Sequence, residues 1–121
     1  MAFIAESTKC RIKGTRMDKA AMLQEILKAN PRDAFARYGL AMDYASKDDL
    51  VASLAEFATL LRDNPEYTPG YFMAAQTLVR AGRTADAKQH LALGIASAAR
   101  TGNSHAQGEM QAMLDELTLD S

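Results

Sequence analysis

The chain of 121 residues has no tryptophan, three prolines and a single cysteine, Cys10. One cysteine excludes an internal disulfide framework and fits a reducing compartment, so we expect a cytoplasmic protein. No apolar run approaches the roughly 18 residues that a membrane-spanning helix needs, so no membrane association is expected. No stretch alternates apolar and polar residues convincingly, so a β-sheet is not expected either.

The main part of the chain also lacks an excess of basic residues. Residues 17–121 hold ten basic and fourteen acidic side chains, whereas nucleic-acid binding needs a basic surface that displaces counterions. We therefore expect no nucleic-acid partner. Residues 1–16 differ, because they carry four basic residues against one acidic residue. We interpret them as a disordered basic leader, with Met17 as an alternative start of translation.

Residue patterns that carry chemistry are missing as well. No phosphate-binding loop, nucleophile elbow or dinucleotide fingerprint occurs. His105 and Glu109 share a helix face at i and i+4, but no third metal ligand lies nearby in the sequence, which favours a solvated pair. The neighbouring carboxylates Asp48 and Asp49 suit helix capping better than acid–base catalysis. We expect no catalysis, no metal and no cofactor.

The chain does contain an internal repeat. Pro31 and Pro65 lie 34 positions apart, and a shift by the same interval places similar residues on one another. The matched pairs are Tyr38 with Phe72, Ala41 with Ala75, Tyr44 with Leu78, Ser53 with Ala87, and Phe57 with Leu91. A fixed period of about 20–50 residues indicates stacked helical units.

Apolar periodicity and turn signals predict six helices. Asn-Pro pairs end two of them, and glycines at positions 82 and 102 end two others. Asp18, Asp33, the pair Asp48-Asp49, Thr84 and Ser104 are the expected helix caps, the last with Gln107 as a capping box. The expected helices cover residues 18–29, 34–47, 49–63, 68 to about 81, 85–100 and 104–117. In the first of them we expect one apolar face of Met22, Leu23, Ile26 and Leu27.

On these matched positions, residues 31–101 resemble the tetratricopeptide repeat (TPR) family, with full repeats at 34–67 and 68–101. Single helices at 18–29 and 104–117 flank the repeats. The resemblance implies an all-α fold, a right-handed α-solenoid of antiparallel helix pairs with about six helices, in one domain over 17–118. Small residues would let paired helices approach closely. The chain departs from the family pattern at four positions, with Arg37 for tryptophan, Asp48 for glycine, Leu60 for alanine and Ala99 for proline.

The resemblance also implies a binding surface on the concave face that the first helix of each repeat lines. The residues predicted to bind a partner there are Phe35, Tyr38, Met42, Phe72, Met73, Gln76 and Arg80. The lysine and asparagine clamp with which the best-known subclass grips chaperone C-terminal carboxylates is missing, and only Arg80 would suit it. An apolar peptide or a partner helix is therefore the expected ligand.

Two functions stay open at this point. One is a non-catalytic bacterial scaffold or adaptor that holds a protein or peptide partner in an apolar groove. The other is a structural module whose concave face meets its own copy in a homodimer. The same aromatic and methionine residues are also compatible with a buried core, or with a groove that the last helix covers.

Overall fold

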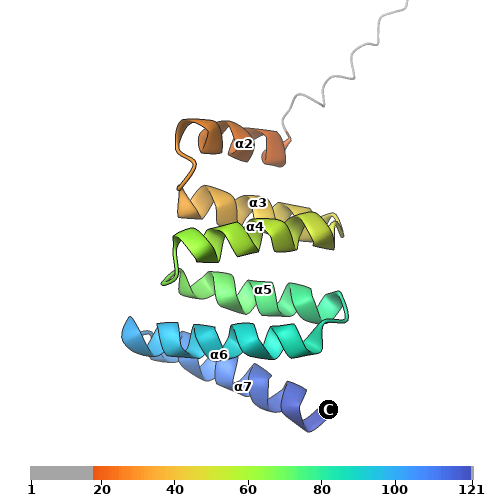
Figure 1. Cartoon of the computed structure of the whole chain (residues 1–121), viewed down its shortest axis with the longest axis vertical. Helices are drawn as coiled ribbons and strands as arrows, with labels where there is room; N and C mark the ends of the chain where they lie inside the picture. The colour runs from red at the N-terminus through yellow and green to blue at the C-terminus, as the bar shows by residue number, and fades with distance from the viewer. Residues whose placement is uncertain (1–17, 121) are drawn as a thin grey trace, which may run out of the picture.

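The computed structural model describes residues 18–120, where it consists of six α-helices and no strands (Figure 1). The helices are α2 (Lys19–Ala29), α3 (Ala34–Ser46), α4 (Leu50–Asp63), α5 (Thr68–Arg80), α6 (Thr84–Arg100) and α7 (Ser104–Asp120). The predicted fold class and helix count are confirmed, and only α7 extends clearly beyond its expected end. The predicted leader, residues 1–16, and Met17 lie outside the described residues.

Side-chain caps define several helix starts. Asp33 and Asp49 cap α3 and α4 as expected, each accepting a hydrogen bond from the backbone N–H three residues on, at 2.9 and 3.2 Å. The expected cap at Ser104 is wrong, because Asn103 accepts the equivalent bond at 3.1 Å. The expected cap at Thr84 is also wrong, since Thr84 is already the first residue of α6.

The turns inside the two full repeats share one backbone conformation. Gly82 has φ 78° and Asp48, 34 residues earlier, has φ 63°. This left-handed conformation is favourable for glycine and costs other residues about 1–2 kcal/mol. Asp48, which replaces the family's glycine, therefore keeps the turn geometry. Its carboxylate accepts a hydrogen bond from Arg80 at 2.8 Å.

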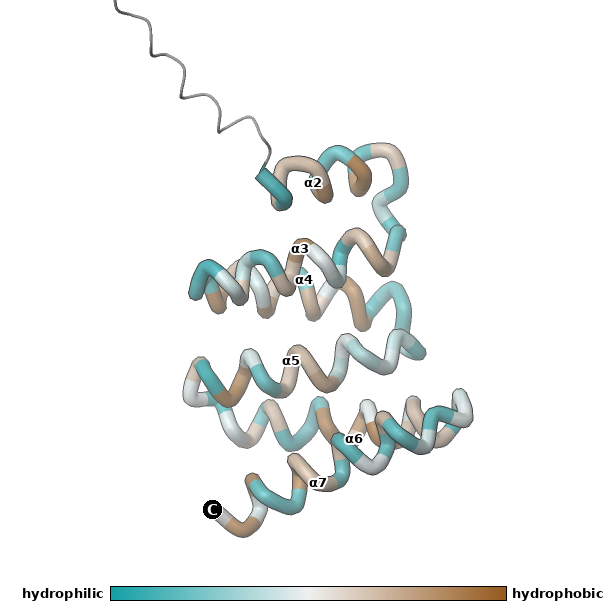
Figure 2. Tube along the Cα trace, turned by 180° about the vertical axis from the view of Figure 1, so that it is seen from behind, coloured by the Kyte–Doolittle hydropathy of each residue, from teal (hydrophilic) through white to brown (hydrophobic). Residues whose placement is uncertain are grey.

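The predicted contacts between small residues hold the helix pairs together. Ala41 on α3 and Ser53 on α4 are fully buried, as are their counterparts Ala75 on α5 and Ala87 on α6. The Ser53 hydroxyl donates a hydrogen bond to the Ala41 carbonyl at 2.8 Å. This bond satisfies a buried polar group and fixes the crossing of α3 and α4. Every helix carries both hydrophobic and hydrophilic residues, as expected for amphipathic helices (Figure 2).

The order of helix contacts gives the stack two different faces. Among the described residues, α3 contacts α5 and α5 contacts α7, whereas α4 contacts neither α2 nor α6. The first helices of the repeats therefore form one continuous row of contacts, whereas α2, α4 and α6 do not contact one another. We call the side formed by α3, α5 and α7 the concave face, and the side formed by α2, α4 and α6 the convex face.

The N-terminal helix is only half covered, which corrects the expected apolar face of α2. Leu27 is buried and Leu23 half-buried against α3, but Met22 and Ile26 are exposed. Leu60, which lies 34 residues after Ile26, is fully buried in the α3–α4 pair. In the described part of the chain, α2 has no preceding helix to cover the equivalent face.

A polar cluster joins the α4–α5 turn to the end of α6. The Glu66 carboxylate accepts hydrogen bonds from Ser97 at 2.9 Å and from Arg100 at 2.7 Å. Buried Thr68 and Ser97 hydroxyls lie 2.8 Å apart and complete the cluster. The hydrogen bond from Arg100, assisted by that from Ser97, holds the pKa of Glu66 below its ordinary value of 4.5.

This cluster makes stability depend on pH in a predictable direction. Because the pKa of Glu66 is lowered on folding, its contribution is present above the unfolded value of 4.5 and is lost as the pH falls below it. We expect Glu66→Gln to lower the melting temperature at pH 7, and the gap from wild type to close as the pH falls below 4.5. Thermal melts of both proteins across this range measure the gap. A gap that stays constant with pH would contradict a charge-dependent role.

Candidate functional site

The seven predicted binding residues lie on α3 and α5, where Phe35 and Arg80 are exposed and the other five are half-buried. Phe35, at the start of α3, leaves 74% of its surface exposed. Phe72 and Gln76 come from successive turns of α5 and are half-buried. Phe72 packs against the core cluster around Tyr71 and Leu91, so its ring is held in place. These side chains offer two aromatic surfaces and one amide.

Three others, Tyr38, Met42 and Met73, are half-buried and anchored in the core between α3 and α5. The Tyr38 ring lies 5.3 Å from the ring of Tyr67 and 6.4 Å, edge-on, from that of Phe57. Burial raises the pKa of the Tyr38 hydroxyl. These three side chains are therefore partly core residues and partly surface residues of α3 and α5.

The two polar residues of the predicted site differ in their partners. Arg80 donates hydrogen bonds to the Ala45 carbonyl at 3.2 Å and to the Asp48 carboxylate at 2.8 Å. Within residues 18–120, the side-chain amide of Gln76 makes no hydrogen bond. Of the two, Gln76 thus has an amide without a partner among the described residues, while Arg80 is engaged in the turn between α3 and α4.

The last helix does not cover the part of the concave face that α3 contributes. α7 packs mainly against α6, also touches α5, and makes no contact with α3. It lies at the C-terminal end of the stack as its next layer (Figure 1). The surface around Phe35 therefore remains open within the described chain.

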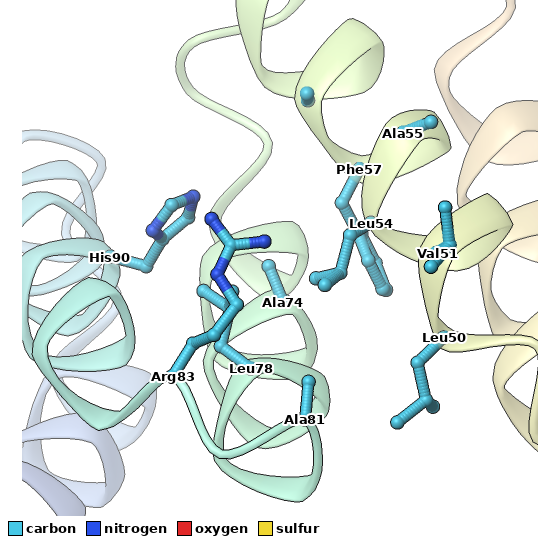
Figure 3. A pocket seen from close by; sticks show the side chains of 11 residues that line it. Leu50, Val51, Leu54, Ala55, Phe57, Ala74, Leu78, Ala81, Arg83 and His90 are labelled. Carbon is cyan, nitrogen blue, oxygen red and sulfur yellow. The ribbon is translucent and has the colours of Figure 1, made fainter.

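A cavity lies on the convex face, where the sequence predicted no site. We call it the convex hollow, and its volume is about 520 Å³. His90 of α6 stands on one side of it and Leu50 and Val51 of α4 on the other, with Ala74 and Leu78 of α5 between them (Figure 3). The hollow is also lined by Leu54, Ala55, Phe57, Ala58, Ala81 and Arg83, and none of the seven predicted binding residues reaches it.

A difference between the repeats explains the apolar character of the hollow. In the equivalent gap between α2 and α4, Tyr44 accepts a hydrogen bond from Gln24 at 3.2 Å, and Arg37 pairs with Glu56 at 2.7 Å. That gap has a smaller volume of about 380 Å³. In the next repeat the equivalents of Tyr44, Gln24 and Glu56 are leucine, alanine and histidine, at positions 78, 58 and 90. The hollow could have been predicted from the sequence by searching for equivalent positions at which the repeats carry unlike residues.

The described residues contain no group of three or more His, Cys, Asp and Glu side chains arranged to hold a metal ion. His105 and Glu109 lie 3.5 Å apart on the exposed surface of α7, as the sequence suggested. Over the described part of the chain, every helix is too short or too polar to cross a membrane.

A stack of antiparallel helix pairs with a continuous row of first helices defines a helical-repeat solenoid. No protein-family model matches the chain. A solved tetratricopeptide repeat domain protein from Salinibacter ruber is 31% identical, with a TM-score of 0.69 over 73% of this chain and 89% of that one. The chain belongs to the tetratricopeptide repeat family.

Two further similarities agree with this assignment. A TPR repeat-containing protein of Pseudomonas aeruginosa is 27% identical over 95 residues, which cover 78% of this chain and 90% of the relative. The fold also matches the TPR2B domain in the TPR2B–pHsp70 complex of yeast Sti1. That similarity has a TM-score of 0.78 at 17% identity and covers 84% of this chain and 82% of the yeast domain.

Proposed function

We propose that the chain is a non-catalytic interaction scaffold that binds an apolar peptide or partner helix on the concave face. Membership of the TPR family supports the scaffold class. The bacterial relatives support our expectation of a bacterial protein, and we further propose a cytoplasmic location on the ground of the single cysteine. We assign the contact to Phe35, Phe72 and Gln76, with Tyr38, Met42 and Met73 as the supporting layer and Arg80 at one end.

The observation that carries this proposal is the pairing of Gln76 with exposed aromatic surface. Gln76 holds an amide without a hydrogen-bond partner in the described chain, one turn from Phe72 on α5. A side-chain amide can donate to and accept from the backbone of a ligand, which fixes its register. Phe35 supplies apolar area at the other side of the face. Most of the binding energy should come from a few such anchors.

Selection from a displayed library of random peptides tests this function, because it requires no identified natural partner. We expect enrichment of peptides rich in aliphatic and aromatic residues. For the selected peptides, Phe35→Ala should weaken binding at least about tenfold, because burying one aromatic side chain contributes about 1.5–3 kcal/mol. Gln76→Ala should weaken it about two- to tenfold, because one hydrogen bond contributes about 0.5–1.5 kcal/mol. Fluorescence anisotropy measures the affinities. Both variants should melt like wild type, since Phe35 is exposed and Gln76 has no partner in the described chain.

Leu119→Ala is the control, because Leu119 is an exposed apolar residue at the far end of the chain. It should bind the selected peptides as wild type does. Tyr38→Ala is a poor test, since its ring packs with Tyr67 and Phe57 and its removal should destabilise the fold. The concave face would be refuted as the binding site if no peptide were enriched. It would also be refuted if the selected peptides bound both variants with the affinity that they have for wild type.

A further inference from the structure

The middle of α4 and the fully exposed positions of α6 before its last turn carry few charges, although surfaces in contact with water are commonly rich in charged residues. On α4, the single charged residue between Leu50 and Leu61 is Glu56, and its carboxylate is turned to Arg37 at 2.7 Å. On α6 the fully exposed residues up to its last turn are uncharged, and the two charged residues there, Asp86 and Lys88, are half-buried, Asp86 in an ion pair with Arg83. The fully exposed residues are Ala85, Gln89, Ala92, Leu93, Ala96 and Ala99.

A projecting side chain stands beside the hollow on this sparsely charged face. Val51 leaves 84% of its surface exposed at the rim that α4 contributes. Leu93 on α6 is a second large exposed apolar residue of the face. A projection and a cavity of the same apolar chemistry on one surface are the elements of a self-complementary contact.

We propose that the convex hollow is covered by a second copy of this chain, in a two-fold symmetric dimer through α4. If the two α4 helices run antiparallel about an axis between Leu54 and Ala55, residue 51 of each copy comes opposite residue 58 of the other. Val51 and Ala58 both line the hollow, so each Val51 enters the cavity of the other copy. The small residues Ala55 and Ala58 let the helices approach closely.

Charge favours a second copy over a charged partner. A sparsely charged face can meet itself with little like-charge repulsion, whereas it offers a charged ligand few counter-ions. The one cation at the rim, Arg83, is already paired with Asp86 at 2.8 Å. His90 also faces Asp86, whose backbone carbonyl lies 3.0 Å from Nδ1. The rim is therefore electrostatically satisfied, and the binding surface is apolar.

The size of the face predicts a weak, reversible dimer. α4 has 14 residues and α6 has 17, which gives lengths of roughly 21 and 25 Å. At ordinary helix spacings the two helices and the gap between them are about 20 Å wide. The area is thus of the order of 400 Å² per copy, below the roughly 800 Å² of a stable complex. The dimer is expected to form at high micromolar concentrations.

Sedimentation equilibrium of the full chain from about 10 μM to about 1 mM tests this dimer. We expect the apparent mass to rise with concentration from 13.1 kDa towards twice that value. Val51→Glu should weaken association at least tenfold, since it places a carboxylate in an apolar contact. Leu119→Glu is a matched control, because Leu119 is 86% exposed and lies outside the face. It should associate like wild type.

A second variant separates this contact from self-association through the concave face. Phe35→Glu should leave the dimer unchanged if α4 forms the contact, and should abolish it if the concave face does. In a Cys10→Ser background, Ala55→Cys should form a disulfide-linked dimer under mild oxidation, because a two-fold axis brings the two positions within bonding reach. The proposal would be overturned if the protein stayed monomeric at all concentrations. It would also be overturned if Val51→Glu left the strength of dimerisation unchanged.

Discussion

Gly94→Ala is expected to destabilise the protein by about 1–3 kcal/mol, because the new methyl group has no space. A Cβ at this position would lie 2.6 Å from the Cβ of Tyr71 and 2.5 Å from the sulfur of Met110. Met110 is buried in the core and has little room to turn aside. The Tyr71 Cβ is attached directly to the backbone of α5. The substitution must therefore push α5 or α7 away from α6.

Gly108→Ala is the matched control for this prediction, since it makes the same chemical change on a neighbouring helix. A Cβ at Gly108 would meet nothing within 4 Å. Alanine should stabilise α7 there by about 0.5–1 kcal/mol, because glycine has the larger conformational entropy in the unfolded chain. Urea denaturation followed by circular dichroism measures both changes. If Gly94→Ala were as stable as Gly108→Ala, the close contact of α6 with α5 and α7 would not be the reason why position 94 requires glycine.

Much of the fold could be predicted from the sequence, because its determinants are local or repeat at a fixed interval. Proline, glycine and aspartate mark the helix ends, and the matched alanines mark the contacts inside each helix pair. The prediction for α2 was only partly correct. Leu23 and Leu27 do pack inward, but the exposure of Met22 and Ile26 depends on which helix precedes α2. A pattern of apolar residues cannot tell a covered face from an uncovered one.

The candidate sites were less predictable, for a reason that lies in the repeat itself. Matching the repeats finds positions that are alike, and these are mostly structural, as Tyr38 illustrates by packing on Tyr67. The convex hollow arises where the repeats differ, as in the exchange of Tyr44 for Leu78. Its depth also depends on the spacing of α4 and α6, which share no contact. That spacing follows from the packing of α5 between them.

Leu60→Ala is expected to lower the free energy of unfolding by about 2–5 kcal/mol, although alanine is the family's usual residue there. Leu60 is fully buried, and Gly70 on α5 provides its space. A Cβ on Gly70 would lie 3.0 Å from the Cδ2 atoms of both Leu60 and Leu61. The chain has thus combined a large residue on α4 with a small one on α5. Alanine at position 60 would leave a cavity opposite a glycine that cannot fill it.

Two further variants make this prediction specific. Ile26→Ala, at the equivalent position of α2, should cost less than about 1 kcal/mol, because Ile26 is 43% exposed. Adding Gly70→Ala to Leu60→Ala should recover part of the loss by filling the cavity, and the double-mutant cycle measures the coupling. If Ile26→Ala proved as costly as Leu60→Ala, Ile26 would have to be covered in solution. The exposed surface of α2 would then be a contact surface. Ile26 would be buried there as Leu60 is buried in the α3–α4 pair, but against a different partner.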